Sequence, residues 1–201
     1  MKIEQIKNTQ YKDVLELDRT IFDSKIALPV EEIEALANPN VGKVLLAING
    51  TNDILGYVFL QTGNSAYSSP YFKILDNNEL YVHTLGVSKD NQDRGVGRFL
   101  LEAVNEFAKL NSFKLISAKV HPDNINSLRV FIKYLGMKAI SIDQNAYGQS
   151  IDRLHLVSEV QKTKIKSRLS QVDFSSLPVG FDLNYSMFIL PVFHVAKLND
   201  T

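Results

Sequence analysis

Apolar residues recur along the first 160 positions with either the period of a strand or the period of a helix. Together they predict the element order β-α-α-β-β-β-α-β-α-β-β. Strands are expected over residues 2–7, 42–50, 53–63, 79–87, 113–120, 137–142 and 153–160, and helices over 11–22, 28–38, 95–110 and 124–135. This order predicts an α/β or α+β fold in which helices cover the faces of one sheet.

The chain changes character after about residue 160. A basic and polar run, QKTKIKSRLSQ, is followed by the turn-rich VDFSSLPVGFDLNY and then by the apolar SMFILPVFHVAKL. We therefore expect one domain over residues 1–160 and a C-terminal extension over 161–201. The apolar part of the extension has three places to be buried: beside the sheet, over the functional site, or in the seam of a homodimer. Pro191 favours an edge or bulge position over a central strand.

Composition and charge remove several classes of function. The 22 Lys and Arg residues balance the 22 Asp and Glu residues, which argues against a nucleic-acid partner. The chain has no cysteine, which excludes disulfides, thiolate metal sites and an acyl-cysteine intermediate. Its four histidines show no metal-ligand spacing, so no metal is expected. Neither a signal peptide nor a run of ~18 apolar residues is present, so we expect a cytoplasmic protein without a membrane partner.

Two glycines, Gly95 and Gly97, fall where a polar turn becomes a long amphipathic helix. A helix N-terminus offers unpaired N–H groups to an anion, and glycine lets a phosphate approach the backbone. A nucleotide P-loop would need Lys after the second glycine, and Arg98 stands there. A dinucleotide fingerprint would need a small residue at position 100, which is Leu. The arrangement that fits is QDRGVG, preceded by the strand ELYVHTLGV.

This stretch resembles the pyrophosphate arm of the coenzyme A site in the GCN5-related N-acetyltransferases, the GNAT family. A second segment, HPDNINSLRVFIKYLGMKAI, is similar to the Asn-containing helix of that family, which ends in Leu-Gly-Phe or Leu-Gly-Met. The resemblance covers about residues 1–160, and its specific motifs lie between Glu79 and Ile140. It implies a mixed, mostly antiparallel sheet of about seven strands, flanked by helices and splayed between the fourth and fifth strands.

The resemblance also implies that acetyl-CoA is the co-substrate. Backbone groups of the fourth strand would pair with the pantetheine, and N–H groups of the glycine loop would hold the pyrophosphate. In the second segment, either Asn124 or Asn126 matches the asparagine of the family, and the choice stays open. The cofactor-binding residues expected on this basis are Leu85, Gly86, Val87, Gln92, Asp93, Arg94, Gly95, Val96, Gly97, Arg98, Asn124, Asn126, Ser127 and Arg129.

The implied reaction is the direct attack of a primary amine on the thioester. An alkylamine with a pKa near ~10 arrives protonated, so the site needs a proton acceptor. In the absence of a bulge, strand alternation puts Glu79, His83 and Leu85 on one face, together with Tyr81. Glu79 and His83 are the predicted proton acceptors, acting directly or through water. The acceptor stays open between a small-molecule amine, a polyamine resembling an aminoglycoside, and a peptide N-terminus or lysine.

One position departs from the family pattern. Many relatives carry a tyrosine four residues before the glycine of Leu-Gly-Phe, as the acid for the leaving thiolate, and here that position is Ile132. Tyr134 is the predicted replacement, with Tyr81 and Tyr147 as further candidates. The departure keeps a second hypothesis open, in which the domain binds acyl-CoA as a sensor or scaffold with little or no transfer.

Overall fold

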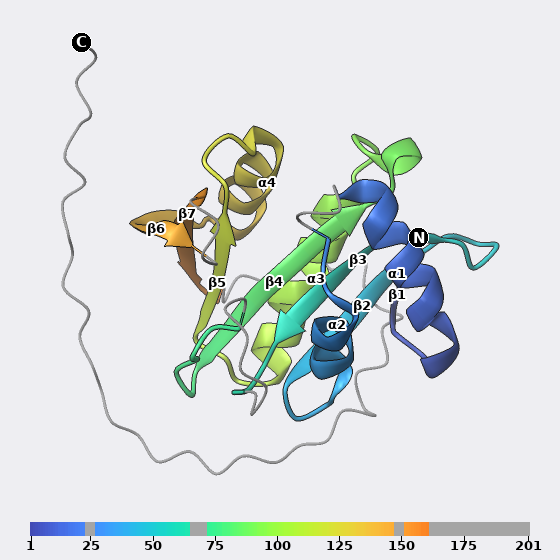
Figure 1. The fold of residues 1–201 in the computed structure, drawn as a ribbon, viewed down its shortest axis with the longest axis horizontal. Helices are drawn as coiled ribbons and strands as arrows, with labels where there is room; N and C mark the ends of the chain where they lie inside the picture. The colour runs from blue at the N-terminus through green and yellow to red at the C-terminus, as the bar shows by residue number, and fades with distance from the viewer. Residues whose placement is uncertain (23–26, 65–71, 147–150, 161–201) are drawn as a thin grey trace.

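A seven-stranded sheet runs through the computed structural model, which describes residues 1–22, 27–64, 72–146 and 151–160 (Figure 1). The strands lie in the order β1-β2-β3-β4-β5-β7-β6, and β4 and β5 form the parallel pair of this sheet. They are β1 (Lys2–Gln5), β2 (Gly42–Ile48), β3 (Ile54–Gln61), β4 (Glu79–Val87), β5 (Leu115–Val120), β6 (Lys138–Ala146) and β7 (Ile151–Glu159). The helices are α1 (Tyr11–Ile21), α2 (Val30–Ala37), α3 (Val96–Leu110) and α4 (Ile125–Leu135). The predicted order of strands and helices is confirmed.

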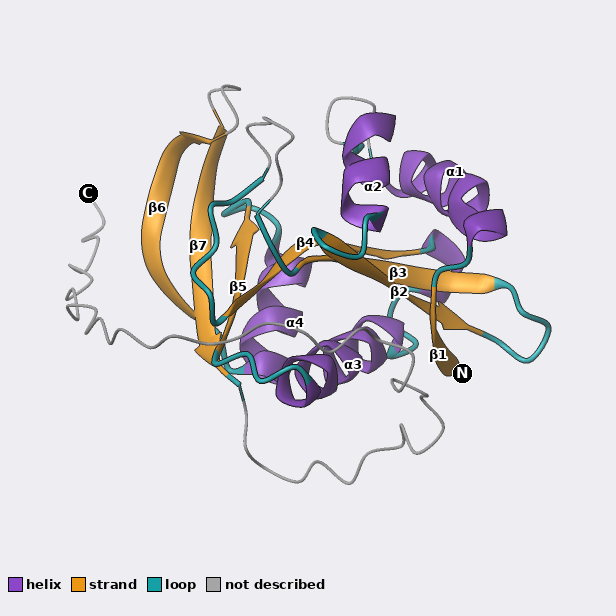
Figure 2. Ribbon diagram, turned by 90° about the horizontal axis from the view of Figure 1, so that it is seen from below, coloured by secondary structure: helices purple, strands orange, loops and turns teal. Residues whose placement is uncertain are grey.

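The helices cover the sheet from both sides, with α1 and α2 on one face and α3 and α4 on the other (Figure 2). The α3 side holds the larger apolar cluster, in which Leu100, Val104 and Phe107 of α3 are buried as their spacing predicts. The α1–α2 side holds a second cluster that includes Val14 and Ile33. Each such side chain contributes about 1.5–3 kcal/mol when it leaves water, so both helical layers are held to the sheet by apolar burial.

The strands β4 and β5 separate part of the way along their length. They pair from Glu79 with Leu115 to Val82 with Ala118, while β4 continues to Val87. The predicted splay between the fourth and fifth strands is therefore confirmed. We call the place where the two strands part the strand opening. It lies toward the carboxyl ends of two parallel strands, where open sheets of this kind commonly bind ligands.

A bulge in β4 lies next to the strand opening. Phe59 of β3 pairs with Thr84, but the next residue, Leu60, pairs with Val82, so His83 is an extra residue in β4. A bulge adds one residue to one strand and reverses the alternation of the side chains beyond it.

The bulge corrects one expectation about β4. Leu85 packs against the apolar cluster on the α3 side. Tyr81 and His83 lie edge to face on the opposite side, with ring centroids 5.9 Å apart. The expectation that Leu85 shares a face with Glu79 and His83 is therefore wrong, because the extra residue turns the rest of the strand over.

The last two strands differ in length from the prediction. β6 runs to Ala146, four residues beyond the expected end. It is the edge of the described sheet and is exposed over most of its length, so no buried face imposes an alternating pattern on its sequence. Among the described helices, none is long and apolar enough to cross a membrane. Tyr147, the segment 65–71 and the C-terminal extension 161–201 lie outside the described residues.

Candidate functional site

The N-terminus of α3 is open beside the strand opening. Its N-cap is Gly95, which has a left-handed backbone (φ 83°) and supplies no side-chain cap. Glycine adopts this conformation without steric penalty. The hydrogen bonds of the helix begin at Phe99, whose amide donates to the carbonyl of Gly95 at 3.0 Å. The amides of the first turn, at residues 96–98, have no carbonyl of the preceding turn to bond to and are directed toward an external acceptor.

The two glycines of this turn are needed for different reasons. A Cβ atom at Gly95 would meet no atom within 4 Å, but its left-handed backbone disfavours any other residue except Asn or Asp. A Cβ atom at Gly97 would meet Val87 Cγ2 at 3.8 Å, an ordinary contact. The folded chain therefore gives no steric reason for a glycine at position 97. A ligand that approaches the backbone at this point would give one.

The polar loop before α3 turns tightly toward the end of β4. Gln92 Nε2 donates to the carbonyl oxygen of Val87 at 3.3 Å. Asp93 has a positive φ of 58°, and both Asp93 and Arg94 are exposed. Past the strand opening, the edge of β4 that faced β5 has no further pairing with it, so its backbone groups are available to an added strand or ligand.

Arg98 joins the start of α3 to α4. Its Nε donates to Glu102 Oε1 at 2.7 Å, and its guanidinium lies over the ring of Tyr134, 5.6 Å from the centroid. The side chain is 59% exposed, so it can still reach an anion at the helix start. Tyr134 thus lies on the α3 side of the sheet. The structure brings it near the glycine loop and not near Glu79 and His83.

The second segment begins with an asparagine cap. The Asn124 side chain accepts a hydrogen bond from the Ser127 amide at 3.1 Å and closes the first turn of α4. Asn126 and Arg129 are exposed on the helix. Gly136 ends the helix with a left-handed backbone (φ 65°), directly after the predicted helix range 124–135. Asn124 therefore has a structural use already, whereas the side chain of Asn126 is exposed to solvent.

A buried acid–phenol pair supports β4 from the α1–α2 side. The Tyr57 hydroxyl donates to Asp18, which also accepts from the Leu28 amide at 3.0 Å. Burial raises the pKa of Asp18, and burial beside Asp18 raises the pKa of Tyr57. The ring of Tyr57 leaves no room above it, because a Cβ atom at Gly86 would lie 2.5 Å from its Cζ atom. Gly86 is therefore a glycine required by packing.

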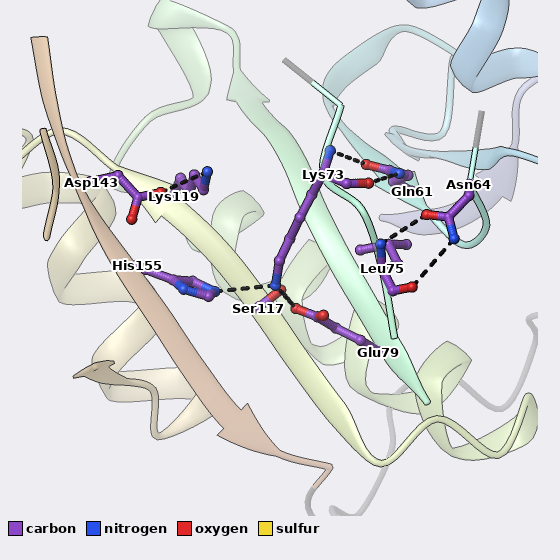
Figure 3. A network of polar contacts seen from close by, with 9 residues as sticks. All are labelled: Gln61, Asn64, Lys73, Leu75, Glu79, Ser117, Lys119, Asp143 and His155. Carbon is purple, nitrogen blue, oxygen red and sulfur yellow. Dashed lines mark hydrogen bonds and ion pairs between the residues drawn. The ribbon is translucent and has the colours of Figure 1, made fainter. Parts of the chain in front are cut away.

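On the α1–α2 side, four polar residues from four parts of the chain meet (Figure 3). The Glu79 carboxylate contacts the Lys73 ammonium and the Ser117 hydroxyl. The Lys73 Nζ atom also lies 3.3 Å from Nε2 of His155 on β7. We call Lys73, Glu79, Ser117 and His155 the polar cluster. Glu79, a predicted proton acceptor, is buried here in an ion pair.

Two amide side chains hold the backbone that carries Lys73. Gln61 Nε2 donates to the Lys73 carbonyl at 2.7 Å, and the Lys73 amide donates to Gln61 Oε1 at 3.1 Å. Asn64 forms the same reciprocal pair with Leu75, at 3.3 and 2.8 Å. These bonds replace the ladder of a strand and fix the segment against the end of β3 (Figure 3).

His83 stands at the strand opening. It is the first residue of β4 beyond the pairing with β5, and it is half-buried. Its Nδ1 atom lies 3.2 Å from the Thr84 hydroxyl, and its ring centroid is 5.6 Å from that of Phe72. The prediction that His83 lies with Glu79 on one face of the sheet agrees with this geometry.

Lys119 occupies the matching position on β5, one residue beyond the pairing. Its Nζ atom lies 2.7 Å from Asp143 Oδ2 of β6, and it pairs in register with His155. Burial and the nearby Lys73 lower the pKa of His155, so its imidazole is neutral at neutral pH. Sequence reasoning missed Lys73, Lys119 and His155. The alternation of apolar and polar residues in RLHLVSEV could have predicted which face of the strand His155 lies on. No local pattern, however, identifies the residues that it contacts.

Two comparisons place this arrangement among known proteins. The profile of the Acetyltransferase (GNAT) family matches residues 9–137. A search of curated proteins found no match in sequence. Solved structures with the same fold include the ribosomal-protein-S18-alanine N-acetyltransferase of Escherichia coli, with a TM-score of 0.62 at 13% identity over 83% of this chain and 97% of that one.

Two further structures extend the likeness. NAA60 of Arabidopsis thaliana, in complex with acetyl-CoA, has a TM-score of 0.64 at 17% identity, over 79% of this chain and 98% of that one. The IAA acetyltransferase of Bacillus cereus has a TM-score of 0.58 at 17% identity, over 78% and 97% of the two chains. At these identities the structures show a shared fold. The profile spans more than half of the chain, and the protein therefore belongs to the GNAT family of acetyltransferases.

Proposed function

We propose that this acyltransferase moves the acetyl group of acetyl-CoA to a primary amine by direct attack in a ternary complex. The observation that carries the proposal is Gly97, whose missing side chain has no explanation in the packing of the protein. It lies in the open first turn of α3, close to the strand opening. Members of this family use acetyl-CoA, and its pyrophosphate is the kind of anion that such a turn binds.

The chain offers backbone groups to each part of that molecule. The amides from Asp93 to Arg98 would hold the pyrophosphate, with the Arg94 and Arg98 side chains adding charge, whereas the Gln92 amide already donates to the Lys89 carbonyl at 3.4 Å. Residues 85–87, on the β4 edge beyond the pairing with β5, would pair with the pantetheine. Asn126, Ser127 and Arg129 would line the α4 side. Bound acetyl-CoA supplies the activated thioester, and the protein supplies orientation and proton transfer.

The residues at the strand opening suit the proton transfers. The amine loses a proton and attacks the thioester carbonyl carbon; the C–S bond then breaks and the sulfur leaves as a thiolate that takes up a proton. His83 is the proposed acceptor of the first proton, because it is the first β4 residue beyond the pairing. Glu79 acts less directly, since Lys73 and Ser117 already hold its carboxylate. Tyr134, the predicted donor to the thiolate, lies against Arg98 at the glycine loop and away from His83, so we propose that the thiolate takes its proton from solvent.

A second function rests on Ile132. This residue stands where many relatives carry the tyrosine acid, and its side chain is 52% exposed. An aliphatic side chain cannot protonate a thiolate. A domain that binds acyl-CoA but transfers the acyl group poorly would act as a sensor or scaffold.

Isothermal titration with acetyl-CoA and with CoA tests the proposal, on the wild type and on Gly97→Trp. We choose position 97 because its backbone is helical, so the substitution does not strain the chain. Wild-type binding that is lost in a variant with an unchanged melting temperature would support the loop assignment. Release of free thiol in the presence of amines then separates the enzyme from the sensor. A folded wild type that binds neither compound would contradict both functions.

A further inference from the structure

We infer that the acceptor is the α-amino group of a peptide or protein N-terminus, and not a lysine side chain or a polyamine. The inference deepens the proposed acetyl transfer and depends on it. It comes from the charges and the bases that the structure places on the α1–α2 side of the strand opening, which is the side that carries His83 and the polar cluster.

Two carboxylates of the strands on this side, one in β4 and one in β6, are already paired with cations. Glu79 contacts Lys73, and Asp143 lies 2.7 Å from Lys119. Arg153, which pairs in register with Asp143, adds a third cation to this side. Among the described residues of these strands, the further carboxylate on this side is that of Glu159, at the far end of β7 opposite Leu115.

This balance of charge disfavours a polycation. A polyamine or a lysine-rich segment brings additional ammonium groups, and each needs a carboxylate within a few ångströms. Here Lys73 and Lys119 already occupy the carboxylates of Glu79 and Asp143. A like charge 4 Å away costs about 1 kcal/mol in water and about 4 kcal/mol near a protein surface. The carbonyl oxygens of a peptide are neutral acceptors, and the same cations can donate to them.

The bases at the opening are imidazoles. His83 and His155 lie on this side, and His155 faces Lys73, Glu79, Asp143 and Lys119. Burial and the nearby Lys73 lower the pKa of His155, so this imidazole is a weak base. Whichever imidazole acts, taking a proton from a peptide α-ammonium, with a pKa of about 7.7–8.0, is easier by roughly 300-fold than taking one from a lysine ammonium, with a pKa of about 10.4.

The distinction can be measured with three acceptors on the intact chain with acetyl-CoA. The first is a lysine-free peptide pool with a free N-terminus, randomised at its first two positions. The second is the same pool with the N-terminus acetylated and one lysine added, and the third is spermidine. Thiol release is followed at pH 7.5 and pH 9.5. We expect kcat/KM at pH 7.5 to favour the free N-terminus by at least about 100-fold, as the neutral fractions of the two amines require.

The pH change gives a second reading. Between pH 7.5 and 9.5 the neutral fraction of a lysine amine rises roughly 90-fold and that of an α-amine roughly 3-fold. The preference should therefore shrink by about 25-fold. Equal or better use of the lysine pool or of spermidine at pH 7.5 would overturn the inference and leave acetyl transfer intact. Binding of acetyl-CoA without thiol release from any acceptor would overturn the proposed transfer itself.

A residue-level test separates the site from the intrinsic chemistry of the amines. Lys119→Gln removes the ammonium group that lies 2.7 Å from the Asp143 carboxylate, and we expect the use of spermidine relative to the peptide pool to rise roughly tenfold. Asp143→Asn is the matched control, because it disrupts the same ion pair without freeing a carboxylate, and spermidine should gain nothing. An unchanged ratio in Lys119→Gln would overturn the role that we assign to the paired carboxylates.

Discussion

The two sides of the strand opening present different chemical groups, backbone amides on one side and polar side chains on the other. On the α3 side, the proposed binding groups are backbone amides of one turn, within a stretch of fewer than ten residues. On the α1–α2 side, side chains converge from the segment before β4 and from β4, β5, β6 and β7. Backbone amides can bind a ligand only where no side chain blocks the approach, so that side depends on a glycine. The polar side chains of the other side are held by partners that lie far apart in the sequence.

The largest effect expected on ligand binding from this contrast concerns Gly97→Ala. The added methyl group should exclude the phosphate from the backbone and weaken acetyl-CoA binding by about 10–100-fold, the cost of losing one charge-assisted hydrogen bond. Stability should stay constant or rise by up to about 1 kcal/mol, because alanine favours the helix. Titration calorimetry and urea unfolding measure the two quantities. Gly50→Ala, where the added methyl group would meet no atom within 4 Å, is the control outside the site, and wild-type affinity in Gly97→Ala would contradict the loop assignment.

The polar cluster should be fragile to the loss of one side chain. Lys73→Met leaves the buried carboxylate of Glu79 without its cation and should cost about 3 kcal/mol of unfolding free energy. The double variant Lys73→Met/Glu79→Gln should recover most of that loss, since no charge is then left uncompensated. Chemical unfolding at pH 7 compares the single and double variants. If the double variant is as unstable as Lys73→Met, the ion pair is not the source of the loss.

A smaller effect should appear as a dependence on pH. The pKa of His155 is lowered in the folded protein, so below about pH 6.5 the unfolded chain binds this proton more readily. The contribution of the neutral His155 to the unfolding free energy is complete above that pH. It falls as the pH drops toward the folded pKa, by at most about 1.4 kcal/mol per pH unit. Urea unfolding between pH 5.5 and 7.5 should show this slope in the wild type and less of it in His155→Gln. If the unfolding free energies of the wild type and His155→Gln depend on pH in the same way, His155 is not held neutral by burial.

The smallest effect should distinguish the two asparagines of α4. Asn124→Ala removes the helix cap and should cost about 1 kcal/mol. Asn126→Ala changes an exposed side chain and should alter stability by less than about 0.5 kcal/mol. If Asn126 is the residue that contacts the cofactor, only its substitution should weaken acetyl-CoA binding while the melting temperature is unchanged.

The same contrast explains what could be predicted from the sequence. The order of elements and the glycine turn follow from local patterns, the splay follows from the resemblance to the GNAT family, and the structure agrees with them. The bulge at His83 could not be predicted, because it exists in the register between β3 and β4. The contact of Lys73 with His155 joins residues 82 positions apart, and no local pattern encodes it. Tyr134 illustrates the intermediate case: its helix was predicted, but its position over Arg98 required the packing of α3 on α4.

The reciprocal amide pairs of Gln61 and Asn64 suggest a use in protein engineering. They hold Lys73 and Leu75 against the end of β3 through side-chain amides, so the backbone there keeps its place without the ladder of a paired strand. Each pair uses both the donor and the acceptor of one amide side chain. Gln61 and Asn64 are therefore positions that a mutant library aimed at this region should keep constant, because a carboxylate in either place would lose the donor of the pair.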